Sequence, residues 1–200
     1  TMSKITNTIC HSIDYRLAPE SPYPAALDDA LASWRQITRN NPDTEIILAG
    51  DSAGGGLSLA LMMYLRDNGE KLPDSAVLFS PWTNLNCDSE TYQTKAKADP
   101  MFVHHMTKDC ARYYVPESID KNEPYISPAH GDFGGLPRTL IMTGGNEILL
   151  DDTRIIGQKA TEQDLDIEVD IWPTMFHDWW LFGSFIPETK QCLKKMSEWI

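Results

Sequence analysis

Hydrophobic residues along the chain gather in short continuous runs, separated by longer segments with helical spacing. The runs at 45–49, 76–80 and 139–143 are typical of strands that are buried on both faces of a parallel sheet. Residues 167–172 alternate between apolar and polar positions and predict a further strand. Residues 9–15, near the start of the chain, are also predicted to form a short strand.

The segments between these runs predict helices, because their apolar residues recur at helical spacing and their ends carry helix-breaking residues. Helices are expected at about 25–39, 57–66, 152–163 and 187–200. Residues 84–130 predict an irregular insertion near the expected functional site, with helical patches near 90–97 and 105–115. Strands that alternate with helices indicate an α/β fold, a mostly parallel sheet flanked by helices, with its chemistry at the carboxyl ends of the strands.

The pattern Gly-x-Ser-x-Gly stands between an apolar strand and an apolar helix, at Gly50-Asp51-Ser52-Ala53-Gly54. This is the setting of a nucleophile elbow, in which small neighbours accommodate a strained serine. The amide of Ala53, at the start of the helix, would point at a developing oxyanion. A phosphate-binding loop is the alternative, but the Gly-Lys-Ser/Thr ending that it needs is missing. Ser52 is therefore the predicted nucleophile.

Around this serine we expect oxyanion-hole or binding roles for four residues. Asp51, Ala53 and Gly54 belong to the turn itself, and Trp82 follows the next strand. Met101, Phe102 and Met106 are candidates for an acyl pocket.

A serine hydroxyl needs a general base within hydrogen-bonding reach, and the base needs an orienting carboxylate. His177 follows the strand at 167–172 by a short loop, and it comes last in the chain order serine, acid, histidine. The acid is expected after the strand at 139–143, where Glu147 lies nearest the strand end. Asp151 and Asp152 remain alternatives, although acids at the start of a helix commonly serve as N-caps.

Composition and charge exclude several classes of function. The formal net charge is −12, and the 17 Lys and Arg residues form no basic patch along the sequence, which argues against nucleic-acid binding. No apolar run reaches the roughly 18 residues that a membrane-spanning helix needs. The predicted serine nucleophile makes a small-molecule substrate the expected partner, and a second copy of the chain, in a homodimer, is kept open.

The cysteines and paired histidines do not indicate a metal site or any other cofactor. Cys10, Cys87, Cys110 and Cys192 lie far apart and form no C-x-x-C pair, which is typical of reduced thiols and weakly favours a cytoplasmic location. Adjacent histidines such as His104-His105 point apart, and no carboxylate pair stands at ligand spacing. We expect His104-His105 to form a solvated helix start.

Taken in order, five segments of the chain resemble the bacterial hormone-sensitive-lipase-like esterases. The matching segments are 14–26, the elbow 50–55, 80–83, 146–152 and 176–179. The resemblance implies an α/β-hydrolase fold in which residues 1–200 form the C-terminal part of a single catalytic domain. It also implies a serine carboxylesterase without cofactors that forms an acyl-enzyme from short to medium acyl esters. The family acid is usually Asp, whereas Glu147 holds that position here.

One departure from the family limits this interpretation. The family carries an H-G-G-G oxyanion loop and a helical cap before the segment that begins here, and the sequence contains neither. We therefore expect an N-terminally truncated chain that is poorly active and, with an unpaired sheet edge, prone to aggregate. Residues 14–20 are expected to form a buried polar network that braces the elbow. A non-catalytic ligand-binding relative and a peptidase on the same fold remain alternatives.

Overall fold

A parallel sheet forms the centre of the computed structural model, which describes residues 2–200. Within that range the sheet has four strands in the order β1-β2-β3-β4. They are β1 (Ile47–Asp51), β2 (Ser75–Phe79), β3 (Thr139–Gly144) and β4 (Ile167–Trp172). The register is parallel throughout, so the carboxyl ends of all the strands meet at one edge of the sheet.

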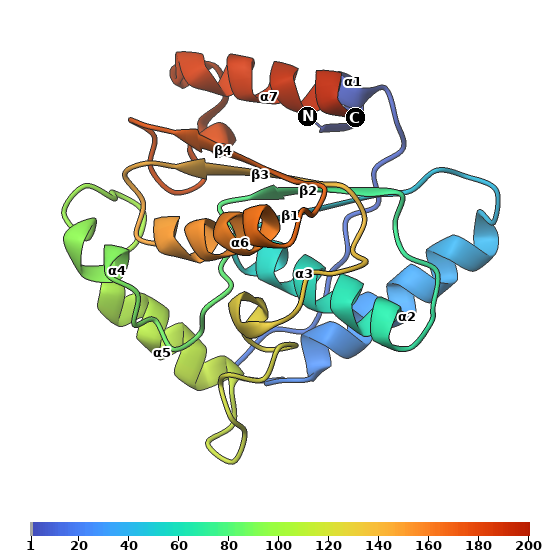
Figure 1. The fold of residues 1–200 in the computed structure, drawn as a ribbon, viewed down its shortest axis with the longest axis horizontal. Helices are drawn as coiled ribbons and strands as arrows, with labels where there is room; N and C mark the ends of the chain where they lie inside the picture. Colours follow the sequence, from blue (N-terminus) through green and yellow to red (C-terminus); the bar gives the residue numbers. More distant parts are fainter. Residues whose placement is uncertain (1) are drawn as a thin grey trace.

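Helices cover both faces of this sheet (Figure 1). One face carries α3 (Ser52–Asp67) and α6 (Leu150–Glu162), with α2 (Ala25–Asn40) packed outside α3. The other face carries α7 (Pro187–Trp199), which contacts the short α1 (Met2–Thr6), so the two ends of the chain lie close together. The predicted α/β fold, a parallel sheet flanked by helices, is confirmed.

Shorter elements surround the edge where the strands end. The segment between β2 and β3 contains α4 (Thr91–Thr94), α5 (His104–Tyr114) and the 3-10 helix η1 (Pro128–His130). A further 3-10 segment, η2 (Trp179–Phe185), connects β4 to α7. These connections lie over the carboxyl edge and supply much of the candidate site.

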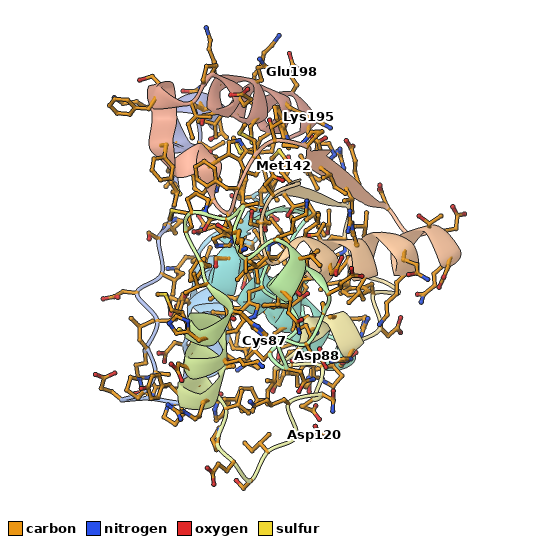
Figure 2. All side chains as sticks on the ribbon, turned by 90° about the vertical axis from the view of Figure 1, so that its left-hand side faces the viewer. Cys87, Asp88, Asp120, Met142, Lys195 and Glu198 are labelled. Atoms are coloured by element: carbon orange, nitrogen blue, oxygen red, sulfur yellow. The ribbon has the colours of Figure 1, made fainter. Side chains whose placement is uncertain are left out.

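Alternate residues of the central strands fill two separate cores. Leu78 and Ile141 point toward α3 and α6, where they pack with Met62. Phe79 and Met142 belong to the core on the opposite face, with the side chains of α7. Figure 2 shows Met142 in the interior, whereas Lys195 and Glu198 lie on α7 toward the outside. Burial of β2 and β3 on both faces accounts for the continuous apolar runs seen in the sequence.

Two predictions about the N-terminal part of the chain are wrong. Residues 9–15 form no regular secondary structure, because no neighbouring strand in residues 2–200 completes a hydrogen-bonded ladder with them. Residues 14–20 do not form a buried network either. Arg16 pairs with Asp29 of α2 at 2.8 Å while its side chain remains 56% exposed, and most of the segment faces solvent.

Helix boundaries differ most at the elbow. The predicted helix at 57–66 begins at Ser52, five residues earlier, although glycines disfavour helix interiors. Packing of the glycine-rich first turns against β1 and Pro81 outweighs that intrinsic preference. In residues 2–200, no helix combines the length and apolar character needed to cross a membrane.

Candidate active site

Ser52 lies at the sharp turn between β1 and α3. Its backbone φ is 51°, in the left-handed region that residues with a side chain adopt only at an energetic cost. Helix α3 begins at Ser52 itself, so the N–H of Ala53 belongs to the first turn and lacks a partner within the helix. The strand-turn-helix setting that the sequence predicts is therefore present.

Two glycines allow this turn to pack tightly. A Cβ at Gly50 would overlap the carbonyl of Gly54, and a Cβ at Gly56 would overlap the carbonyl oxygen of Trp82. The backbone N–H of Trp82 donates to the carbonyl oxygen of Ser52 at 2.9 Å. The elbow is thus fixed against the segment that follows β2.

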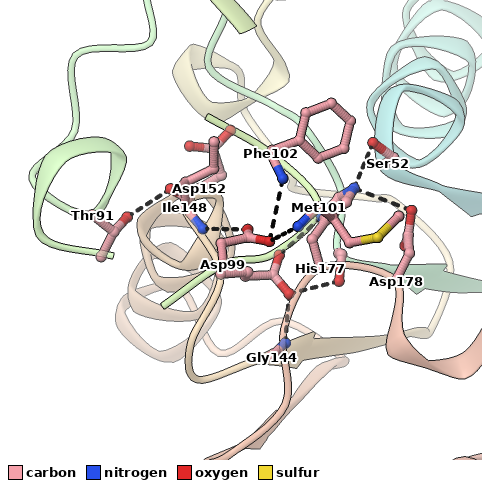
Figure 3. Close-up of polar contacts among 12 residues, drawn as sticks. Ser52, Thr91, Asp99, Met101, Phe102, Gly144, Ile148, Asp152, His177 and Asp178 are labelled. Carbon is pink, nitrogen blue, oxygen red and sulfur yellow. Dashed lines mark hydrogen bonds and ion pairs between the residues drawn. The ribbon is translucent and has the colours of Figure 1, made fainter. Parts of the chain in front are cut away.

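His177 reaches the serine from the loop between β4 and η2. Its Nε2 lies 2.9 Å from Oγ of Ser52 (Figure 3). The His177 side chain is fully buried, and the ring of Phe102 packs edge-on against it at a centroid distance of 4.8 Å. This burial fixes the plane of the imidazole.

Glu147 approaches the other ring nitrogen of His177 from the loop between β3 and α6. Its Oε1 is 3.5 Å from Nδ1, an ion-pair separation, and neither atom has a hydrogen-bond partner in residues 2–200. Its Oε2 accepts hydrogen bonds from the Ser80 hydroxyl and the Gly144 amide, each at 2.7 Å. The structure therefore brings together Ser52, His177 and Glu147 at the carboxyl edge of the sheet.

The two alternative acids are engaged elsewhere. Asp152 is fully buried and accepts the amide hydrogens of Thr83 and Asn84, both at 2.8 Å. Burial raises the pKa of Asp152 to about 7, although these hydrogen bonds oppose the shift. Asp151 accepts the amide hydrogen of Thr91 at 3.0 Å. Both acids brace the connection after β2 instead of orienting His177.

The sequence assigned no role to Asp178, which also contacts the histidine. Its Oδ2 lies 3.1 Å from Nε2 of His177, on the same side of the ring as Ser52 (Figure 3). Burial lowers the pKa of His177, but hydrogen bonds to Asp178 and Glu147 outweigh it and raise the pKa to about 10. The only signal for Asp178 in the sequence was its position directly after His177, the candidate base.

The remaining predicted site residues lie around the elbow. Asp51 ends β1 at the surface, and partial burial of its carboxyl group, together with the nearby Asp178, raises its pKa. Ala53 is exposed beside Ser52. Gly54 accepts a hydrogen bond from Ser58 and would leave room for a Cβ, so close packing does not require glycine there.

A largely apolar cavity of about 310 Å³ opens beside Ser52. Trp82 and Phe102 line it, together with Leu57, Leu85, Tyr114 and Ile126. Met101 and Met106, which were candidates for the same pocket, lie outside this lining and are 38% and 45% exposed. No group of three or more His, Cys, Asp or Glu side chains in the described chain is arranged to hold a metal ion.

Comparison with known proteins decides the family. A family model described as alpha/beta hydrolase fold matches residues 1–181. The chain belongs to the α/β-hydrolase fold family. An acetyl-hydrolase of Streptomyces hygroscopicus is 38% identical to this α/β hydrolase, over 92% of the chain and 61% of the relative. An esterase of Acinetobacter venetianus is 33% identical over 93% of the chain and 62% of the relative.

Solved structures place this α/β hydrolase within a narrower group. A crystal structure of an esterase from the bacterial hormone-sensitive lipase family matches with a TM-score of 0.94 and 35% identity, over 99% of this chain and 67% of that one. The esterase EstE5, soaked with p-nitrophenyl butyrate, matches with a TM-score of 0.93 and 36% identity, over the same shares of the two chains. The predicted membership of the hormone-sensitive lipase family is confirmed.

This α/β hydrolase spans about three-fifths of the length of the curated relatives that it matches. Within the described residues, the backbone N–H of Ala53 lies in the first turn of α3 at the elbow. The family's H-G-G-G loop has no counterpart in the sequence.

Proposed function

We propose that this chain carries the Ser-His-acid machinery of a carboxylic-ester hydrolase. The observation that supports the proposal most strongly is the continuous contact from Ser52 Oγ through His177 to Glu147, with separations of 2.9 and 3.5 Å. A serine, a histidine and a buried carboxylate in this order form the arrangement that activates a hydroxyl for acyl transfer. Relatives named acetyl-hydrolase and esterase support the same reaction class.

In the proposed mechanism, Ser52 Oγ attacks the ester carbonyl while His177 Nε2 takes the hydroxyl proton. Glu147 orients the imidazole through Nδ1 and stabilises its positive charge. The N–H of Ala53, at the start of α3, donates to the oxyanion. His177 then protonates the leaving alcohol, and water hydrolyses the acyl-enzyme by the reverse use of the same groups.

The proposed substrates are short to medium acyl esters. The cavity beside Ser52 measures about 310 Å³ and presents mostly apolar side chains, among them Leu57, Trp82 and Phe102. An apolar pocket of that size suits a small acyl or alcohol group without charge. The p-nitrophenyl butyrate soaked into EstE5 is an ester of this class.

The test is release of p-nitrophenol from p-nitrophenyl butyrate, together with labelling by a fluorophosphonate probe. Ser52→Ala should lower turnover by roughly three orders of magnitude or more and abolish labelling, because the nucleophile is lost. His177→Ala should remove most turnover for want of a base. Ser118→Ala, which changes an exposed serine far along the chain, is the matched control and should leave both signals unchanged.

Equal turnover by the chain and by Ser52→Ala would contradict the proposal. Failure of the probe to label the unmodified chain would support a non-catalytic ligand-binding relative instead.

A further inference from the structure

Both ring nitrogens of His177 face carboxylates, which an ordinary serine triad does not require. Glu147 Oε1 lies 3.5 Å from Nδ1, and Asp178 Oδ2 lies 3.1 Å from Nε2. Ser52 Oγ lies 2.9 Å from the same Nε2. The nitrogen that has to accept the serine proton is therefore shared between the nucleophile and a second acid.

The backbone holds Asp178 in this position. Its φ of 51° and ψ of 34° are left-handed, and the residue immediately precedes η2. The residue is only 5% exposed, and its Oδ1 has no hydrogen-bond partner in residues 2–200. A buried carboxylate with a free oxygen is costly unless its charge is compensated. His177 is the positively charged partner that the geometry offers.

The donors and acceptors around His177 determine which protonation state of its imidazole fits this contact. A neutral imidazole that donates through Nδ1 to Glu147 presents a lone pair at Nε2. At 3.1 Å that lone pair would face the Asp178 carboxylate, acceptor against acceptor. An imidazolium has a hydrogen on each nitrogen and satisfies both acids. It cannot, however, accept the proton of Ser52.

We propose that Asp178 is a positioning residue that holds a proton on His177 Nε2. His177 then has to lose this proton to water before it can activate Ser52. The inference rests on the proposed ester hydrolysis and adds a pH-dependent control to it. Loss of the proton leaves neutral His177 with a free Nε2 that can accept the hydroxyl hydrogen of Ser52. No other bond is made or broken in this step.

The charged groups around the pair reinforce the effect. Glu147 faces Nδ1 from the loop after β3, and Asp51, at the end of β1, lies close enough to His177 and Asp178 for both to affect the pKa of its own carboxyl group. Asp99 and Asp152 lie further out, where Asp99 accepts three backbone amide hydrogens and Asp152 accepts two. Phe102 covers the ring and is uncharged. The pKa of His177 is raised to about 10, the direction expected when two carboxylates stabilise the protonated imidazole.

The experiment measures the rate of fluorophosphonate labelling of Ser52 against pH in the full 200-residue chain. The unmodified chain should label faster as pH rises, with a midpoint well above the usual histidine pKa of about 6.5. Asp178→Asn and Asp178→Gly should move this midpoint down by roughly one to two pH units, the usual effect of losing an adjacent charge. Both replacements tolerate a left-handed backbone, so the fold should persist.

Asp51→Asn is the matched comparison, because it removes the same charge from a carboxylate that does not touch Nε2. It should move the midpoint by less than half as much as the Asp178 variants. An unchanged midpoint in the Asp178 variants would overturn the inference. An equal shift in Asp51→Asn would also overturn it, because general surface charge would then explain the effect.

A second readout separates this inference from the proposed function. Histidine NMR follows the titration of His177 whether or not the serine reacts. If no variant labels at any pH, the proposed hydrolysis fails, and the NMR midpoints then decide the inference alone. A lower midpoint in Asp178→Asn supports the shared proton, and equal midpoints in the two chains contradict it.

Discussion

The two sides of the candidate site are built from very different parts of the sheet. The acid side follows β3, all six residues of which are buried between neighbouring strands. The nucleophile side follows β1, which pairs only with β2 in the described chain and has no fully buried residue. Glu147 is completely buried and its Oε2 accepts two hydrogen bonds, whereas Asp51, beside Ser52, lies at the surface.

This difference shows how the sheet holds the loops of the candidate site in place. A central strand fixes the loop that follows it from both sides, and the buried polar groups of that loop are directed by backbone amides. In the described residues β1 pairs with β2 alone, and the turn after it is also held by the close contact between Gly56 and Trp82. Within the described residues, contacts on the β3 side hold His177, whereas the β1 side contributes the turn at Ser52.

The largest effect is expected on the acid side. Glu147→Gln should lower turnover by roughly 10³–10⁴-fold, because an amide cannot stabilise the imidazolium and can hold the wrong tautomer. Asp151→Asn is the matched control in the same loop, and its carboxylate binds Thr91 instead. It should retain most activity. Steady-state hydrolysis of p-nitrophenyl butyrate measures both, and a greater loss in Asp151→Asn would move the acid assignment to that residue.

An intermediate effect is expected on the nucleophile side. An extended chain that carries the family's H-G-G-G loop before Thr1 should turn over esters roughly 10²–10³-fold faster, the usual worth of an oxyanion donor. The extended chain with its three loop glycines changed to proline, which lacks the N–H, is the control. Comparable kcat/KM for the short and extended chains would show that Ala53 alone suffices.

The smallest effect concerns stability and uses one substitution in both strands. Ile141→Val, in fully buried β3, should lower the free energy of unfolding by about 0.5–1.5 kcal/mol. Ile47→Val, in partly exposed β1, should lower the free energy of unfolding by less than half as much. The methyl group removed there is partly exposed, so its loss leaves a smaller cavity. Urea unfolding midpoints measure the difference. Equal losses would mean that β1 is as well packed as the centre of the sheet.

Much of the sheet could be predicted because its strands carry their own signal. Burial on both faces makes β2 and β3 continuously apolar, and the alternation of β4 gives its bounds directly. Residues 9–15 carry a similar local pattern but form no strand, because a strand also needs a neighbour that the pattern does not specify.

The residues of the candidate site also fall into those that the sequence could predict and those that it could not. Ser52, His177 and Glu147 could be placed because each follows a predicted strand, and parallel strands bring such positions to one edge. Asp178 could not, because its contact with Nε2 depends on a left-handed backbone at a single residue. The hydrogen bond from Ser80 to Glu147 could not be predicted for a similar reason, because Ser80 also has a left-handed backbone, with a φ of 43°.

The left-handed backbone at Ser52 has a consequence for how such a sequence persists over time. A serine in that conformation costs on the order of 1–3 kcal/mol, which glycine would largely avoid. Mutation to glycine is therefore a route toward a more robust fold that has lost its reactive hydroxyl. Selection for stability alone would favour glycine at this turn.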